Sequence, residues 1–505
     1  MAFIRKIRRN GKTYLAEVEN YRSDGKVKQR HIKYLGLDPD SDLSHLSFCS
    51  SDLSVSSVKV HGPIIVLESI ARELDLFNLL GNKISAPILT LVFAHCLDYK
   101  SVLETENWFK KTDLSTIMRV DKITSNQLYE SLEELSKCDF EFIEKSIFEK
   151  LTDIFEQDES GVIYDGTNTH CLGSLSSLAK KGKDKEGVRG RKIIQIGLGV
   201  TKKLGLPIFH QVHEGNIHDT KMFNEAILKF NSMGVKSGLS VFDRGITSTE
   251  CISKLTKLGW KCLAGLQNHK GVKSAISNLD FESMDNFKNM VIQGDTKFFV
   301  KSIPFQIGQT KGKLIILQNY LKKQKIKIER MASIDRARDL LNDRPELVDD
   351  TLLKYFNSNN KINIHAVNRA EKYDGLSFLF TNAKLNQKQA VEYYFAKDIV
   401  ERCFRTAKSS LSLRPIRLVH DHKIRAHIMV CYIGLALLTT VRLRLNKAAI
   451  HTEPSAVLKS LETIFKVYLI GTKTKGNLRF PFTKVNTLSN TQKKLIKIIA
   501  PNIEM

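Results

Sequence analysis

The alternation of polar and apolar side chains in residues 1–60 is typical of β-strands. Two strand-like stretches lie on either side of Asp24 and Gly25, a residue pair that favours a tight hairpin turn. A serine-rich stretch, residues 41–57, follows them. We therefore predict a small N-terminal β-rich unit that ends in a linker.

The hydrophobic period changes in residues 61–157. Apolar residues there recur at steps of three and four positions, which is the spacing of an amphipathic helix. Ser125 stands where the last of these helices would begin, and serine is a preferred N-cap residue. The pattern predicts a helical domain.

Short apolar runs alternate with helical patterns in residues 158–266. Three strands in series are followed by helix, strand, helix and strand, which predicts a mixed five-stranded sheet with helices on its faces. The five expected strands are the segments 161–167, 192–201, 206–215, 239–245 and 260–266.

Residues 267–385 form a more variable block that separates this sheet from the helices after it. The block contains several strand-like stretches, among them 361–367, and one charged helix expected over 322–356. We predict a β-rich insertion domain here.

The helical pattern returns in residues 386–450. Its most apolar run, Ile428 to Val441, has 14 residues and lies between two arginines. A helix needs about 20 apolar residues to span a bilayer, so we predict a buried helix. Residues 451–505 are basic and give no clear prediction.

The amino-acid composition indicates what kind of partner the protein binds. The 505 residues include 78 Lys and Arg against 54 Asp and Glu, a formal net charge of +24, which points to a polyanionic partner. The eight cysteines are scattered without a zinc-type spacing, which indicates reduced thiols and an intracellular protein. The basic N-terminus lacks the long apolar core of a signal peptide.

One acid lies among bases in the helical segment around residue 400. With about 100° of rotation per residue, a continuous helix would put five side chains on one stripe. They are Tyr394, Lys397, Glu401, Arg405 and Lys408. A solvated charged face would explain this stripe by itself, so its meaning depends on whether other carboxylates join Glu401.

Two further acids end apolar strands. Asp165 follows "GVIY" and Asp243 follows "LSVF". Each alone could be an Asx turn after a strand, but strand ends are also where ligands gather in open α/β sheets. Three converging carboxylates would repel one another unless cations neutralised them, and hard oxygen ligands suit Mg²⁺ or Mn²⁺.

In these acids and in the helical stripe, the sequence resembles the DDE transposases of insertion sequences, in the broad IS-four-like group. That group carries a signature Y-(2)-R-(3)-E-(6)-K, and the chain has Tyr394, Lys397, Glu401 and Lys408 at the same spacings. Lys397 replaces the arginine, which keeps the charge but loses the planar guanidinium. "YDGT" and "FDRG" resemble the first and second aspartate motifs of the group.

The resemblance implies an RNase H-like core interrupted by the β-rich insertion, preceded by a DNA-binding or linking helical domain and the small β unit. The six expected segments are 1–60, 61–157, 158–266, 267–385, 386–450 and 451–505.

The resemblance also implies roles for single residues. Asp165, Asp243 and Glu401 would be the catalytic acids and would hold two Mg²⁺ or Mn²⁺ ions. Tyr394, Lys397 and Lys408 would contact DNA phosphates, and the helical geometry adds Arg405 to them.

The implied activity is cut-and-paste DNA transposition. The enzyme would cleave at terminal inverted repeats, pass through a DNA hairpin, and join the freed 3′ ends to target DNA. A homodimer would pair the two ends, and the enzyme would be cytoplasmic, associated with the nucleoid of a prokaryote.

Two other functions stay open. One is a transposase-derived DNA-binding protein without catalysis, and the other is an RNase H-like nuclease that cuts without joining. The Lys-rich connection from Lys180 to Lys192 is either a solvated loop or a further DNA contact. Trp260 is expected in the core rather than stacked on a base.

Overall fold

The computed structural model describes residues 2–9, 12–23, 26–37, 53–97, 101–156, 161–173, 175–235, 238–281, 284–471 and 481–503. The chain forms two compact units, one made of residues Met1–Ser131 and Thr440–Met505 and the other of Leu132–Thr439. Each unit is described by itself below. The boundaries of the six expected segments stay predictions.

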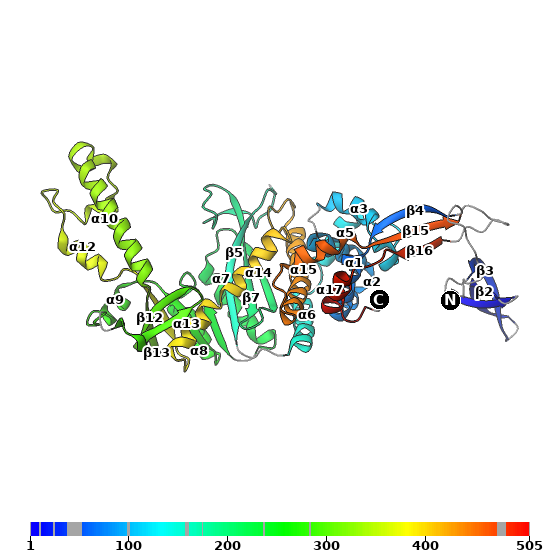
Figure 1. The fold of residues 1–505 in the computed structure, drawn as a ribbon, viewed down its shortest axis with the longest axis horizontal. Coiled ribbons are helices and arrows are strands. Elements are labelled where there is room, and N and C mark those ends of the chain that lie inside the picture. The colour runs from blue at the N-terminus through cyan, green and yellow to red at the C-terminus, as the bar shows by residue number, and fades with distance from the viewer. Residues whose placement is uncertain are drawn as a thin grey trace. The chain divides into compact units, whose positions relative to one another are not determined.

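The larger unit is built on the predicted mixed sheet (Figure 1). Its five core strands run in the order β8-β7-β5-β9-β10, with β7 antiparallel to both neighbours and β9 parallel to β5 and β10. They are β5 (Val162–His170), β7 (Lys192–Thr201), β8 (Pro207–Glu214), β9 (Leu239–Phe242) and β10 (Lys261–Leu266). The predicted five-stranded arrangement is confirmed.

Helices pack on the faces of this sheet. After its first residue, β7 is buried throughout, which is why its sequence is an unbroken apolar run. Phe223 and Phe230 from α7 pack against sheet aromatics, and Trp260 contacts Phe230 with only 1% of its surface exposed. Trp260 is thus a core residue. The helices are α6 (Phe140–Phe155), α7 (Asp219–Ser232) and α8 (Thr249–Lys257).

The insertion interrupts the chain but not the sheet. Its strands continue the sheet beyond β10 in the order β14, β13, β12, β11, all antiparallel, and β6 adds a short pair to β7. The predicted strands of the insertion are present, and they extend the core sheet rather than form a second sheet. The insertion's strands are β11 (Met290–Gln293), β12 (Thr296–Ile307), β13 (Thr310–Gln318) and β14 (Leu376–Thr381), whereas β6 (Lys180–Lys181) belongs to the connection between β5 and β7.

The rest of the insertion is helical and extends past the sheet edge (Figure 1). Residues 361–367 were predicted as a strand, but α12 begins there because the Asn363 side chain accepts the amide of Ala366. The expected helix over 322–356 ends at Asp343. These helices are α9 (Lys270–Ala275), η4 (Phe287–Asn289), α10 (Tyr320–Asp343), η5 (Pro345–Leu347), α11 (Asp350–Leu353) and α12 (Ile364–Glu371).

The segment around Glu401 is two helices rather than one. The helix α13 (Gln387–Phe395) ends before Ala396, and α14 (Asp398–Ser409) begins after Lys397. Ala396 and Lys397, which lie between the two helices, keep right-handed helical backbone angles, so the helix is interrupted by a turn while the predicted stripe continues across it.

The apolar run at 428–441 lies in α15 (Asp421–Lys447) and is buried, as predicted. Two described helices are long and apolar enough to cross a membrane, α2 (Leu76–Leu97) and α15, but 61% and 89% of their apolar windows are buried inside the protein. Burial of this extent is typical of core helices.

The smaller unit joins N-terminal and C-terminal residues. The strands β1 (Ala2–Arg9), β2 (Lys12–Ser23) and β3 (Lys26–Leu37) form one antiparallel sheet, and the Asp24–Gly25 turn lies outside the described residues. A second sheet has the order β16-β15-β4. Its strands are β4 (Leu53–Val60), β15 (Phe465–Gly471) and β16 (Pro481–Val485).

Two expectations for this unit were wrong. Residues 53–57 of the predicted linker belong to β4, while 41–52 lie outside the described residues. Thr124 rather than Ser125 caps α5, because its hydroxyl accepts the amide of Gln127. The helices are α1 (Gly62–Glu73), α2, α3 (Val102–Lys111), α4 (Leu114–Ile117), α5 (Ser125–Leu135, which ends in the larger unit), α16 (Pro454–Ser460), η6 (Leu461–Thr463) and α17 (Asn490–Ile499).

Asp113 connects the second sheet to the helices. Its buried carboxylate shares a 2.8 Å hydrogen bond with His61, accepts the hydroxyl of Tyr468 and lies 3.4 Å from the Lys466 ammonium. Burial raises the pKa of Asp113, but the bonds from His61 and Tyr468 and the charge of Lys466 outweigh it and lower the pKa to about 2.

We predict that Asp113→Asn destabilises this unit by about 2 kcal/mol at neutral pH. Because the folded pKa is lowered from 3.8 to about 2, the stabilisation is present above the unfolded value and is lost as pH falls through the folded one. Urea unfolding followed by Trp108 fluorescence in a Trp260→Phe background measures it. Asp121→Asn, at an exposed position, is the control and should change little. An equal loss at low and neutral pH would contradict the assignment.

Candidate active site

Strand pairing puts two aspartates at the same level of the sheet. The last paired residues of β5 and β9 are Ile163 and Val241, and each lies two positions before an aspartate, Asp165 or Asp243. Neighbouring strands lie about 4.8 Å apart, and parallel strands end at the same sheet edge. Asp165 and Asp243 are therefore neighbours.

The electrostatics of Asp165 agree with this placement. Burial, together with the charge of Asp243, raises the pKa of Asp165 to about 6, although the charge of Lys185 and the amide of Gly166, 2.8 Å away, oppose the shift. Two carboxylates at this edge are thus only partly neutralised by the protein's own cations.

Tyr394 and Lys397 both contact Asp243. The Tyr394 hydroxyl donates to Asp243 Oδ1 at 2.7 Å, and Lys397 Nζ lies 3.2 Å from the same oxygen and 4.8 Å from the centre of the Tyr394 ring. Burial raises the pKa of Asp243, but these two partners outweigh it and hold the pKa below its ordinary value. Burial and Asp243 raise the pKa of Tyr394, so its hydroxyl keeps its proton.

A glycine makes the approach of Tyr394 possible. A Cβ atom at Gly265 on β10 would lie 2.5 Å from the Tyr394 hydroxyl and 2.9 Å from the amide nitrogen of Arg244. Both distances are shorter than van der Waals contact. Only glycine at this position lets Tyr394 reach Asp243 along the sheet.

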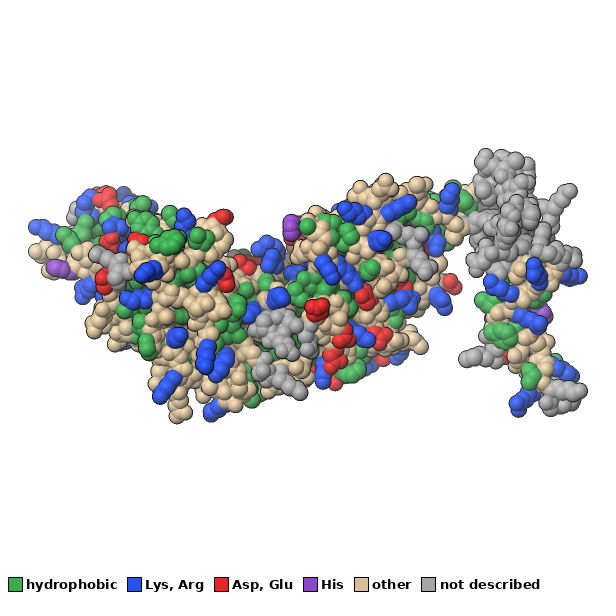
Figure 2. All heavy atoms as spheres, turned by 60° about the horizontal axis from the view of Figure 1, so that its bottom comes forward, with side chains coloured by type: hydrophobic (Ala, Val, Ile, Leu, Met, Phe, Trp, Pro, Cys, Tyr) green, Lys and Arg blue, Asp and Glu red, His purple; other side chains and the backbone are tan. Residues whose placement is uncertain are grey.

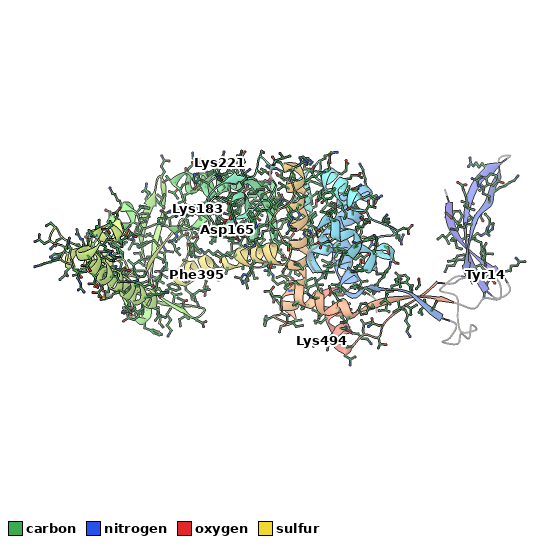
Figure 3. The ribbon with its side chains drawn as sticks, turned by 90° about the horizontal axis from the view of Figure 1, so that it is seen from above. Tyr14, Asp165, Lys183, Lys221, Phe395 and Lys494 are labelled. Atoms are coloured by element: carbon green, nitrogen blue, oxygen red, sulfur yellow. The ribbon has the colours of Figure 1, made fainter. Side chains whose placement is uncertain are left out.

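Glu401 lies in the first turn of α14, with its side chain exposed. Its charge, together with that of Asp243, raises the pKa of Tyr394, so both carboxylates lie near the same hydroxyl. The helix α14 packs on β5 and β7 and passes beside Asp165 in Figure 3. Its buried face consists of Val400, Cys403, Phe404 and Ala407.

The residues of the predicted stripe lie on both sides of the turn before α14. Tyr394 ends α13 and Lys397 lies in the turn, where both side chains reach Asp243. Lys408, in the last turn of α14, is half-buried near Asp165 and Lys185. Burial and the charge of Lys185 lower its pKa. Arg405 is exposed on the same helix.

The three carboxylates suit a hard divalent cation. Their donor atoms are all oxygen, which Mg²⁺ and Mn²⁺ prefer. Asp165 also retains a raised pKa beside Asp243, and a bound cation would relieve that repulsion. The donor set and the charge distribution therefore fit the ion that the resemblance implies.

Comparison with known proteins identifies the family of this chain. A family model described as "Transposase DDE domain" matches residues 156–437, more than half of the chain. The chain belongs to the DDE transposase family. A second model, "IS1634 family transposase, N-terminal domain", matches residues 4–46, which places the transposase among those of insertion sequences. The predicted family and enzyme class are confirmed.

Other comparisons add little. No curated protein matches this transposase. Among solved structures, the cryo-EM structure of the piggyBac transposase synaptic complex with hairpin DNA is similar with a TM-score of 0.40 and 10% identity, over 79% of each chain. A TM-score this low carries no argument about site or mechanism. The roles of the individual residues stay predictions.

We predict that Gly265→Ala lowers the rate of DNA cleavage by at least about tenfold, because misplacing a positioned group by about 1 Å can cost that much or more. The new methyl group would displace Tyr394 from Asp243. Cleavage of DNA carrying the element end, measured with variants of equal circular dichroism, tests this. Gly271→Ala, where a Cβ would meet only the His269 side chain at 3.1 Å, is the control and should retain activity. Equal rates for both variants would contradict the role of Tyr394.

Proposed function

We propose that this DNA transposase cleaves at the terminal inverted repeats of an insertion sequence and joins the freed ends to target DNA. The observation that carries the proposal is the double contact of Tyr394 and Lys397 with Asp243. It unites the second aspartate motif with the Tyr–Lys–Glu–Lys segment 151 residues later in the chain.

The acids would hold the metal. Asp165 and Asp243 at the sheet edge and Glu401 on α14 are the oxygen donors, and two Mg²⁺ or Mn²⁺ ions would activate the attacking hydroxyl and stabilise the leaving oxygen. Lys397 lies 3.2 Å from Asp243 and would compete with a bound metal for this carboxylate. Release of Lys397 from Asp243 would free its ammonium for DNA.

The cations would position the DNA. Lys397, with Tyr394, would contact phosphates near Asp243, and Lys408 and Arg405 would do so along α14. First, water would hydrolyse one phosphodiester and leave a 3′-hydroxyl on the element. That hydroxyl would then attack a target phosphodiester, so that one ester bond forms as another breaks.

Three finer parts of the proposal rest on the family resemblance. Excision would pass through a DNA hairpin on the element end. A homodimer would hold the two ends together. The enzyme would act in the cytoplasm on the nucleoid.

The test is an assay with the element's own flanking repeats, Mg²⁺ and a supercoiled target. We expect joined product from the natural chain. Asp165→Asn should still bind DNA but lose at least about a thousandfold in rate, because a lost metal ligand abolishes the chemistry more than phosphate attraction. Asp295→Asn, at an exposed turn, is the control and should join normally.

Each other outcome identifies a rival. Cutting without joining would indicate the nuclease, and DNA that is bound but uncut by the natural chain would indicate the inactive binding protein. A denaturing gel of the same reaction would show whether a hairpin forms, and its absence from all excision products would remove that step.

A second test concerns the metal directly. We predict that Mn²⁺ binds the natural chain in calorimetry and that Asp165→Asn or Asp243→Asn weakens binding by at least about tenfold. Asp295→Asn should bind as the natural chain does. Unchanged Mn²⁺ binding in both aspartate variants would place the metal elsewhere.

A further inference from the structure

The Lys-rich connection between β5 and β7 returns to the acidic edge of the sheet. Asn168 holds it there, since its amide nitrogen donates to the carbonyl of Lys183 at 2.9 Å and its oxygen accepts the amide of Lys185 at 3.4 Å. In Figure 3, Lys183 lies beside Asp165. The connection is therefore attached to the strand that carries Asp165.

The ammonium of Lys185 is the part of this connection that reaches the site. It donates to the carbonyl of Gly166, the residue after Asp165, and lies 3.6 Å from Asp219 Oδ2. Its charge acts on Asp165 and on Lys408. Lys185 thus stands on the Asp165 side of the acids, while Lys397 stands on the Asp243 side.

We propose that Lys185 is a further phosphate-binding residue of this transposase, and that Asp219 and Asn168 are positioning residues that hold it beside Asp165. The ligand is the sugar–phosphate backbone of the DNA. The inference rests on the proposed function, because it assumes that DNA crosses this edge of the sheet.

The present partners of Lys185 leave it able to bind a phosphate. An ammonium group has three N–H donors, and the Gly166 carbonyl and Asp219 occupy two. The side chains of Lys185 and Asp219 are 38% and 28% exposed, and ion pairs between such groups are weak. Asp219 is fixed in the first turn of α7, where the helix dipole favours an acid. The ammonium is therefore held in place but remains accessible from solvent.

DNA strands passing the acids would then meet cations on both sides. Lys408 is near Lys185, and the charges of Asp184 and Asp165 offset the repulsion between these lysines only in part. A backbone phosphate would add a further anion at this position. The rival explanation is that Lys185 only balances the charge of Asp165 and touches no DNA.

Salt-dependent binding separates these explanations. A short fluorescein-labelled DNA duplex is titrated in EDTA at several salt concentrations, so that no cleavage occurs. If Lys185 contacts a phosphate, Lys185→Gln should reduce the slope of log affinity against log salt by about 0.9, and Lys185→Arg should restore most of it. Lys181→Gln removes the same charge from an exposed position of the same connection and should leave the slope nearly unchanged.

Asp219→Asn tests the positioning. It should bind DNA at least as tightly as the natural chain, because it removes a negative charge, yet cleave the element end several-fold more slowly. Equal slopes for Lys185→Gln and the natural chain, or equal effects of Lys185→Gln and Lys181→Gln, would overturn the proposal. Binding that depends on Lys185 in a protein that never joins DNA would instead refute only the proposed function.

Discussion

The repulsion between carboxylates at one edge of the sheet is the constraint on which the candidate site depends. Parallel pairing of β5 and β9 brings Asp165 and Asp243 to the same level, and burial makes their charges costly. The protein compensates unequally. Asp243 has a tyrosine hydroxyl and a lysine ammonium, whereas Asp165 has a more distant lysine and one backbone amide. A site that is left partly uncompensated can accept divalent cations.

The insertion contributes to this site through the sheet rather than as a separate domain. Its strands follow β10 edge to edge, and α13 packs against β10, β11 and β12. The Phe298 ring on β12 lies 5.2 Å from that of Phe395, the residue after Tyr394. The insertion therefore supports the end of α13 from which Tyr394 reaches Asp243, with room provided by Gly265.

Basic side chains are spread over the molecule, so net charge alone does not locate a DNA path. Figure 2 shows Lys and Arg side chains scattered over the face drawn there rather than gathered in one patch. Lys185 and Lys397 are proposed to contact DNA because their ammonium groups lie close to acids at the sheet edge. The place of these two lysines, and not the total number of lysines, distinguishes them from the others.

The sequence by itself determined the elements of the core and the family. Hydrophobic period is a local property, so all five core strands and the helices between them were predictable, as was the buried α15. The spacing of Tyr394, Lys397, Glu401 and Lys408 led to the DDE transposases, and the family match confirms that family. Local rules were less reliable at element ends, where Thr124 and Asn363 rather than the expected pattern fixed the helix starts.

Only the tertiary structure decided which distant residues meet. The helical period puts Tyr394 and Lys397 on one face, but only the packing of this segment on the sheet gives them Asp243 as their partner. The pairing of β4 with β15 depends on contacts between residues about 400 positions apart, such as Val60 with Phe465. Lys185 could not be selected from its neighbours in the Lys-rich connection, because its position beside Asp165 depends on Asn168 and Asp219. Such contacts are formed by packing between elements, which a one-dimensional pattern does not encode.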